Sequence, residues 1–274
     1  MRLAAVLGHP VAHSRSPALH NAAYRALGID ATYVAIDVPP ASLEQALGGI
    51  AALGFMGVNI TVPHKEAALR ACDEVDEVAR LCRAVNTIVV DAGGRLAGYN
   101  TDVEGFRRSV EETLGRVPPR AVVLGAGGAA RAVTLALAQA GATVRVVARN
   151  VEKARHLHDL GANEVLPWRA ESLEPTDLLV DATSIGLGAE SEAAAPPLPL
   201  DALPDGALVA SLVYHREPAL LAAARARGLR TLDGAGMLVH QAAAAFMLMT
   251  GRPAPLEIMR AAFGTSLARQ LTSH

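Results

Sequence analysis

The stretch Arg120-Ala-Val-Val-Leu-Gly-Ala-Gly-Gly-Ala-Ala130 has the pattern of a strand, a glycine-rich turn and the start of a helix. The apolar run Arg120–Leu124 predicts a buried strand, and Ala129–Gln139 predicts a helix. Gly125 suits the tight turn, and Gly127 lets the backbone approach an anion at the helix N-terminus, where free N–H groups favour negative charge. An ordinary strand-to-helix turn is the alternative. Because a strand and a helix flank the glycines in the right order, the stretch predicts a dinucleotide-binding fold.

The end of the next strand bears on which dinucleotide would bind. The predicted strand Thr143–Val147 ends just before Arg149, and Lys153 follows in a helix predicted over Val151–Leu160. No carboxylate that could bind a ribose 2′-hydroxyl stands at the strand end, whereas the two cations could pair with a 2′-phosphate. Two solvated surface charges are the alternative. The sequence therefore predicts NADP in preference to NAD.

Upstream of this stretch, short apolar runs alternate with helical patterns, which predicts a mostly parallel sheet. The predicted strands and helices alternate along the chain as Leu3–Gly8, Pro17–Leu27, Thr32–Asp37, Ser42–Leu53 and Met56–Thr61. A helix near Pro63, a hairpin over Val85–Tyr99 and a helix over Val103–Leu114 follow. The turn cluster Gly115–Pro119 then indicates a domain boundary.

Downstream, apolar runs at Leu178–Asp181 and Ala207–Ser211 predict further strands of a doubly wound sheet, with an exposed loop at Ala193–Pro199 between them. Helices are predicted from about Gly236 and Leu256. The fold class is therefore α/β, with an N-terminal α/β substrate domain and a C-terminal Rossmann-type domain. We predict a substrate-binding and catalytic domain at 1–115, an NADP-binding domain at 116–236, and C-terminal helices at 237–274 that pack back on the first domain.

The composition argues against several kinds of partner. The chain has 274 residues, with 25 Lys and Arg against 27 Asp and Glu, so it lacks the positive charge that binding to nucleic acid or an anionic membrane would need. Pro10 and neighbouring polar residues interrupt the apolar start, so we do not expect it to act as a signal peptide. We expect a cytoplasmic protein whose partner is a small molecule. The oligomeric state stays open, with a homodimer as one alternative.

Cysteines and histidines give no indication of a metal site. Cys72 and Cys82 are the only cysteines, and we expect both to be core thiols. The histidines of the first half, at positions 9, 13, 20 and 64, match no standard cluster, so we predict no metal and expect most of them at the surface or behind the site. The apolar run Met237–Met249 is too short to span a bilayer and predicts a buried helix.

Three segments of the first half carry polar side chains that a fold alone does not require. In His13-Ser-Arg-Ser-Pro17, Ser16 could simply cap the following helix, with Pro17 at its first position. Alternatively, the hydroxyls of Ser14 and Ser16 hold a substrate carboxylate at the helix N-terminus. The other two segments are Asn59–Lys65, where a strand end leads into a helix, and the pair Ala84–Thr87 and Gly98–Asp102.

Taken in order, these segments resemble the motifs of the shikimate dehydrogenases along nearly the whole chain. The matches are S-x-S at Ser14 and Ser16, N-x-T-x-P-H-K ending at Lys65, A-x-N-T around Asn86, G-x-N-T-D ending at Asp102, GAGGAA at Gly125, Ala182–Gly186, Val213–Tyr214 and Gly234–Ala242. The resemblance implies reduction of 3-dehydroshikimate to shikimate with NADPH. The alternatives are a quinate or dual quinate/shikimate dehydrogenase that uses NAD, and a non-catalytic ligand-binding paralogue, against which the retention of Lys65 and Asp102 argues.

The resemblance also implies roles for individual residues. The residues it assigns to the substrate's hydroxyls and carboxylate are Asn59, Thr61, Asn86, Tyr214 and Gln241. Their amide and hydroxyl side chains suit such a substrate because each can donate and accept hydrogen bonds. The cofactor turn comprises Gly125, Ala126, Gly127, Gly128 and Ala129, and the nicotinamide side comprises Thr183, Ser184, Leu212 and Gly234. The sequence departs from the family pattern at Ala148, Asn150, Asp181, Leu187 and Ser211.

Reducing a ketone requires a hydride at carbon and a proton at oxygen, so one ionisable group must lie close to the carbonyl oxygen. Lys65 is the candidate, because Lys65 and Lys153 are the only lysines and an amine, unlike a guanidinium, can release its proton. A solvated cation is the alternative. Asp102 would pair with Lys65 and a substrate hydroxyl, or would merely cap a helix. Which of the two transfers the proton cannot be read from the sequence.

Overall fold

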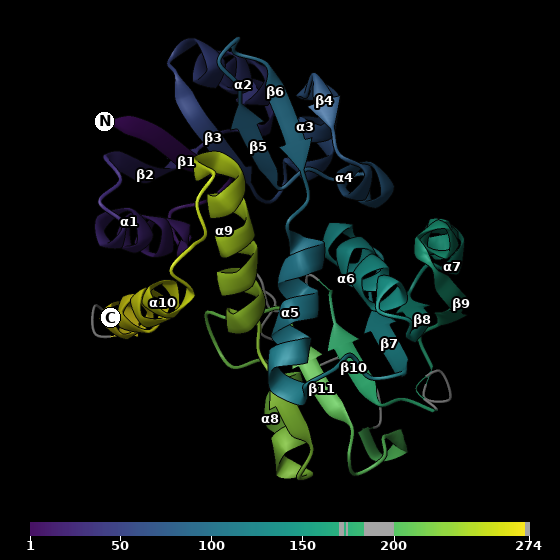
Figure 1. Ribbon diagram of the computed structural model, residues 1–274. Coiled ribbons are helices and arrows are strands. Elements are labelled where there is room, and N and C mark those ends of the chain that lie inside the picture. The colour runs from purple at the N-terminus through teal and green to yellow at the C-terminus, as the bar shows by residue number, and fades with distance from the viewer. Residues whose placement is uncertain (170–172, 174, 184–199, 272–274) are drawn as a thin grey trace. The chain divides into compact units, whose positions relative to one another are not determined.

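The chain folds into two compact units. A computed structural model describes residues 1–169, 173, 175–183 and 200–271 (Figure 1). Met1–Gly105 and Val239–His274 form the first unit, and Phe106–Leu238 form the second. The predicted functional domains, with limits at 115 and 236, stay a prediction, because compactness does not test which residues bind substrate and cofactor. The predicted loop Ala193–Pro199 lies outside the described residues.

A six-stranded mixed sheet is the centre of the first unit. Its strands are β1 (Arg2–Gly8), β2 (Ala31–Asp37), β3 (Phe55–Ile60), β4 (Glu74–Val75), β5 (Thr87–Val90) and β6 (Leu96–Tyr99), in the order β2-β1-β3-β5-β6-β4. The pairs β1–β2, β1–β3 and β4–β6 are parallel, while β3–β5 and the predicted hairpin β5–β6 are antiparallel. The predicted α/β class with a mostly parallel sheet is confirmed.

This pairing brings distant segments to one edge of the sheet. Asn59 lies opposite Thr87, and Thr87 lies opposite Tyr99. Because β5 runs against β3 and β6, its amino end meets the carboxyl ends of its two neighbours. The residues that follow β3, precede β5 and follow β6 therefore gather at one place.

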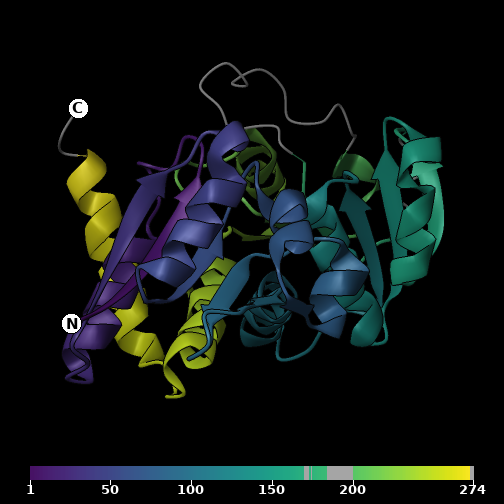
Figure 2. The ribbon, with the colours of Figure 1, turned by 90° about the horizontal axis from the view of Figure 1, so that it is seen from above.

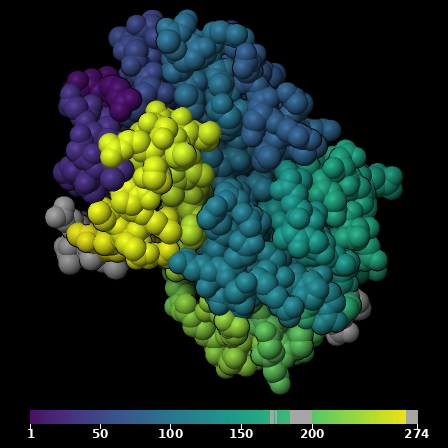
Figure 3. All heavy atoms as spheres, in the orientation of Figure 1, coloured from purple at the N-terminus to yellow at the C-terminus, as the bar shows by residue number. Residues whose placement is uncertain are grey.

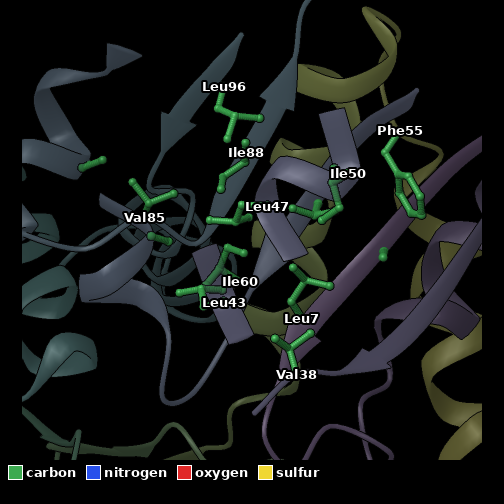
Figure 4. Close-up of a cluster of buried hydrophobic side chains, with 14 residues drawn as sticks. Leu7, Val38, Leu43, Leu47, Ile50, Phe55, Ile60, Val85, Ile88 and Leu96 are labelled. Atoms are coloured by element: carbon green, nitrogen blue, oxygen red, sulfur yellow. The ribbon is translucent and has the colours of Figure 1, made fainter. Parts of the chain in front are cut away.

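Helices cover both faces of this sheet. On one face lie α2 (Leu43–Ala52), α3 (Lys65–Ala71) and α4 (Glu77–Cys82), with Leu43, Leu47 and Ile50 packed toward strand residues such as Leu7 and Ile60 (Figure 4). The spacing of these three α2 residues is that of one helix face. Each fully buried side chain of this kind contributes about 1.5–3 kcal/mol relative to an exposed one.

The opposite face is covered by α1 (Ser16–Ala26), α9 (Ala235–Thr250) and α10 (Leu256–Leu271). Neighbouring residues of a strand point to opposite faces of the sheet. Val58 of β3 packs with the α2 residues, whereas a Cβ on Gly57, the residue before it, would meet Met249 of α9. Helix α9 therefore packs on the face opposite α2. Figure 2 shows α2 and α10 on opposite sides of the sheet, and Figure 3 shows α10 (yellow) against α1 (purple). The C-terminal helical segment thus completes the first unit.

The second unit contains a six-stranded parallel sheet. Its strands are β7 (Arg120–Leu124), β8 (Thr143–Ala148), β9 (Ala162–Pro167), β10 (Leu178–Asp181), β11 (Leu208–Ser211) and β12 (Arg230–Leu232), in the order β12-β11-β10-β7-β8-β9. The helices are α5 (Asp102–Leu114), which begins in the first unit, α6 (Gly128–Gln139), α7 (Val151–Ala154) and α8 (Ala219–Ala226). The chain moves from β7 outward to β9 and then returns to β10, which is the doubly wound order that was predicted.

One predicted helix is shorter than expected. Instead of a helix over Val151–Leu160, α7 ends at Ala154 and a 3₁₀ helix continues over Arg155–Leu160. Gly161, with φ +91°, ends it in the left-handed region that glycine adopts most easily. The apolar spacing predicts a helical segment correctly, but it does not distinguish an α-helix from a tighter last turn.

The short elements β4, α4, β9, α8 and β12 were not predicted from the sequence.

Other expectations concern single features. Cys72 is half-buried, Cys82 is buried, and neither of these two described residues forms a disulfide. Within the described residues, no three His, Cys, Asp or Glu side chains gather as a metal site. No helix in that same part of the chain combines the length and the apolar character needed to cross a membrane.

A buried histidine lies in the layer between the sheet and the C-terminal helices. The His20 ring stacks on Tyr33 with centroids 4.2 Å apart, and Phe246 of α9 lies 6.1 Å away. Neither ring nitrogen has a hydrogen-bond partner. Burial lowers the pKa of His20 from 6.5 to about 3, so the ring is neutral in the folded protein. His20 thus belongs to the core, while the expectation of surface positions or positions behind the site concerned most of the histidines and not each one.

We predict that His20 makes the fold sensitive to acid. Below its ordinary pKa of 6.5 the unfolded chain protonates this ring, whereas the folded chain does not until about pH 3, so stability falls across that interval. Between about pH 7 and pH 5, urea unfolding should show wild type losing about 2 kcal/mol more than His20→Phe. The exposed His13, changed to Gln, is the control and should behave as wild type. Equal pH dependence in all three proteins would contradict this account.

Candidate active site

Lys65 and Asp102 form an ion pair at the edge where β3, β5 and β6 meet. The Lys65 Nζ lies 2.6 Å from Asp102 Oδ2, and the two side chains are 23% and 10% exposed. Lys65 is the first residue of α3, whose start is anchored by the buried His64 ring through Nε2, 2.7 Å from the Val38 carbonyl oxygen. The backbone N–H of Asp102 donates to Asn100 Oδ1 at 3.0 Å. Both charges are therefore held by rigid elements.

Asn86 fixes the other oxygen of the carboxylate. Its Nδ2 donates to Asp102 Oδ1 at 2.8 Å, and its Oδ1 accepts from the backbone N–H of Thr101 at 2.8 Å. Both oxygens of Asp102 are thus engaged by side chains, one by an ammonium and one by an amide. This arrangement favours the ion-pair interpretation of Asp102 over that of a simple helix cap.

Asn59 lies next in the same cluster and is also buried. Its Nδ2 donates to Thr87 Oγ1 at 3.0 Å and to the Asn86 carbonyl at 3.2 Å. Its Oδ1 accepts from the Tyr33 hydroxyl at 2.7 Å. Neither Tyr33 nor Thr87 was among the predicted site residues, since a β-branched or aromatic residue on a strand indicates only packing.

The structure argues against the alternative that Ser16 only caps the following helix. Helix α1 begins at Ser16 with Arg15 as its N-cap, so Ser16 does not cap the helix with Pro17 at the first position. Instead, Ser14 Oγ accepts from the backbone N–H of Ser16 at 3.3 Å. The Ser14 hydroxyl thus binds the backbone N–H of the first helical residue, and the Ser16 side chain bonds with Tyr33.

The remaining predicted substrate residues divide between the units. Thr61 follows β3, and its methyl group packs against Gly8. A Cβ added to Gly8 would lie 2.4 Å from that methyl carbon. Gln241 is half-buried in α9 of the first unit, whereas Tyr214 is half-buried in the second unit. The structure therefore gathers Lys65, Asp102, Asn59 and Asn86 by direct contacts and leaves Tyr214 in the other unit.

The glycine turn of the second unit lies at the switch point of the sheet. Gly125 follows β7 with φ +107°, and a Cβ there would lie 3.1 Å from the Ala182 carbonyl at the end of neighbouring β10. Gly127 precedes α6, and a Cβ there would meet no atom within 4 Å. The turn is therefore tight on one side and open at the helix N-terminus. Both features suit a pyrophosphate.

The other predicted cofactor residues follow the same strand ends. Thr183 comes after β10, and its N–H and hydroxyl donate to Asp181 Oδ1 at 3.0 and 2.7 Å. Burial raises the pKa of this Asp181 carboxyl, which replaces the amide of the family pattern. Gly234 packs on Leu212, since a Cβ would lie 2.1 Å from the Leu212 carbonyl oxygen. Ser184 and Leu187 lie outside the described residues.

Two cations mark the end of β8. Arg149 follows the strand and Lys153 lies in α7, and both are exposed. Asn150 caps α7, because its Oδ1 accepts from the backbone N–H of Lys153 at 2.9 Å. The departure from the family pattern at Asn150 therefore keeps the helix cap. Ala126, Gly128 and Ala129 complete the turn and the first turn of α6.

A doubly wound parallel sheet with an open glycine turn, together with an α/β unit that holds a lysine–aspartate pair among amides, defines a dinucleotide-dependent oxidoreductase. Comparison with known proteins agrees with this class. Residues 6–88 match the shikimate dehydrogenase substrate binding domain, and residues 234–262 match the shikimate 5′-dehydrogenase C-terminal domain.

Whole-chain relatives extend these matches. A shikimate dehydrogenase (NADP(+)) of Symbiobacterium thermophilum is 46% identical, over 98% of this chain and 96% of the relative. One of Moorella thermoacetica is 48% identical, over 96% and 94%. The crystal structure of the Thermus thermophilus enzyme in complex with NADP(H) and shikimate has a TM-score of 0.86 at 40% identity, over 97% and 100%. The chain belongs to the shikimate dehydrogenase family, and the predicted family and fold class are confirmed.

We predict that Gly127→Ala weakens cofactor binding without weakening the fold. The added methyl group has room within the protein, but it occupies the space where a pyrophosphate would approach the helix N-terminus. The KM for NADP should rise about tenfold, equivalent to about 1.4 kcal/mol. Urea unfolding of the free protein should be unchanged. Gly206→Ala, also in open space, is the control; an unchanged KM in Gly127→Ala would place the pyrophosphate elsewhere.

Proposed function

We propose that this chain catalyses the reversible, NADP-dependent reduction of 3-dehydroshikimate to shikimate, a step of aromatic amino-acid biosynthesis. The observation that carries the proposal is the Lys65–Asp102 ion pair, set among buried amides in a chain of this family. We further propose a cytoplasmic enzyme that acts on a small-molecule substrate. The homodimer stays an open prediction.

The substrate would be held through its polar groups. Ser14 and Ser16, at the N-terminus of α1, are assigned to the carboxylate, because hydroxyls and free N–H groups at a helix start suit an anion. The ring hydroxyls are assigned to the remaining polar side chains of the motifs, namely Asn59, Thr61, Asn86, Gln241 and, from the second unit, Tyr214. These residues both donate and accept, as a neutral polyol requires.

The reaction adds a hydride to the ketone carbon and a proton to its oxygen. NADPH, when bound, supplies the hydride. Lys65 Nζ holds the proton that passes to the oxygen as its negative charge develops, and in the reverse direction it receives the proton of the substrate hydroxyl. Asp102 Oδ2 holds the ammonium in place, and Asn86 keeps the carboxylate from rotating.

An absorbance assay for NADPH tests the proposal directly. Purified protein should reduce NADP with shikimate, and turnover should be lower with quinate and lower with NAD. Faster turnover of quinate with NAD would instead favour the alternative dehydrogenase. Absence of turnover in every combination would indicate a ligand-binding paralogue.

We predict that Lys65→Arg lowers kcat about a hundredfold or more, the usual scale for a general acid–base group. The variant keeps the positive charge but replaces the amine with a guanidinium that does not release its proton. The KM for NADP should change little, since the cofactor turn lies in the other unit. Lys65→Met should be no more active than the Arg variant. A near-normal kcat for Lys65→Arg would show that only charge matters at this position.

We also predict that Arg149→Ala raises the KM for NADP at least tenfold, because a charge-assisted hydrogen bond to the 2′-phosphate contributes about 1.5–3 kcal/mol. The KM for NAD, which lacks that phosphate, should hardly change. The exposed Arg155, which pairs with Glu152, provides the control variant Arg155→Ala. Equal effects of Arg149→Ala on both cofactors would contradict recognition of the phosphate.

A further inference from the structure

An ordered series of hydrogen bonds joins the buried interior of the first unit to the ion pair. It runs from the Tyr33 hydroxyl to Asn59 Oδ1 at 2.7 Å, and from Asn59 Nδ2 to Thr87 Oγ1 at 3.0 Å. It continues from Thr87 Oγ1 to Asn86 Oδ1 at 3.0 Å, and from Asn86 Nδ2 to Asp102 Oδ1 at 2.8 Å. We infer that Tyr33 and Thr87 are positioning residues, whose hydroxyls fix the orientation of the two amides that serve the substrate site.

Neither hydroxyl can act by touching the substrate. Tyr33 is 1% exposed and Thr87 is fully buried. Each contacts residues that do reach the predicted site: Tyr33 bonds Asn59 and Ser16, and Thr87 bonds Asn59 and Asn86. They must therefore act through those partners, and this inference rests on the proposed function, which assigns the partners to the substrate.

The direction of the series is set at both of its ends. At one end, burial raises the pKa of the Tyr33 phenol well above its ordinary value, so it keeps its proton and donates. At the other end, Asp102 accepts from both Asn86 and the Lys65 ammonium. Reversing the Asn59 amide would turn its oxygen toward the Asn86 carbonyl oxygen, which has no proton to give. One orientation is therefore strongly preferred.

This orientation decides what each amide offers to a ligand. Both hydrogens of Asn59 Nδ2 are used, by Thr87 and by the Asn86 carbonyl, while Oδ1 keeps one lone pair after accepting from Tyr33. Asn59 can thus only accept from a substrate hydroxyl. The side chain of Asn86 is fully engaged, since it donates to Thr101 and Asp102 and accepts from Thr87 and the Thr101 N–H. Asn86 therefore orients Asp102, and a ring hydroxyl that binds Asn86, as proposed above, replaces one of these bonds.

The two positioning residues should have different kinetic effects. Tyr33→Phe removes only the bond to Asn59 and the contact with Ser16. Because Asn59 and Ser16 are both assigned to ground-state binding of the substrate, the KM for shikimate should rise about tenfold. The kcat should change less than about threefold. Thr87→Val keeps the shape but removes bonds to both amides. It should raise that KM by a similar factor and also lower kcat about tenfold or more, because Asp102 loses its orientation.

Rescue and control variants separate positioning from general stability. Thr87→Ser restores the hydroxyl and should return kcat and KM to within about threefold of wild type. Thr134 lies in α6 of the second unit, and its buried hydroxyl has no hydrogen-bond partner. The control variant Thr134→Val should therefore leave kcat and the KM for shikimate unchanged. The KM for NADP should stay within about twofold in all variants, since this cluster belongs to the first unit.

The experiment measures kcat and KM for shikimate and NADP in wild type and these four variants, with melting curves to verify folding. The expected pattern supports the inference. Wild-type constants in Thr87→Val, or no rescue by Thr87→Ser, would overturn it. If Thr87→Val does not fold, the Tyr33→Phe and Thr87→Ser constants decide. An inactive wild-type protein would instead overturn the proposed function, and the inference with it.

Discussion

The ion pair between Lys65 and Asp102 is the interaction on which the proposed chemistry depends. The two charges are 2.6 Å apart, and because their side chains are only 23% and 10% exposed, they have lost much of their hydration. Their attraction offsets the free-energy cost of that lost hydration only where the geometry is good and the remaining polar atoms have hydrogen-bond partners. Asn86 satisfies the second carboxylate oxygen, and Asn100 fixes the backbone at Asp102. The pair thus requires its amide surroundings.

The mixed sheet explains why these residues can meet. A wholly parallel sheet would place only the residues that follow strands at its carboxyl edge, whereas the antiparallel β5 contributes the residue that precedes it, Asn86. The second unit follows the rule of a parallel sheet, because its glycine turn and Thr183 come after the adjacent parallel strands β7 and β10. The hairpin is therefore the part of the fold that completes the site of the first unit.

Much of the fold and several residues of the candidate site could be predicted from the sequence, because apolar runs and short motifs are local patterns. Apolar runs indicated most strands of both sheets. The motifs singled out Lys65 and Asp102, which form an ion pair, and the glycine turn, which precedes α6; their functional roles stay predictions. Tyr33 and His20 were missed because their roles arise from contacts between β2, β3 and α1 that no local pattern records. The alternative that Ser16 only caps its helix was wrong, because the helix begins one residue earlier than that interpretation requires and Ser16 is its first residue.

A double-mutant cycle tests most directly whether Lys65 and Asp102 act as one catalytic unit. The measurement is kcat/KM for shikimate in wild type, Lys65→Met, Asp102→Asn and the double variant. Groups that act together lose their effect when either is removed, so the double variant should be no worse than the poorer single variant. Losses that multiply across the two single variants would show that the residues contribute independently, and would contradict the ion pair as the functional centre.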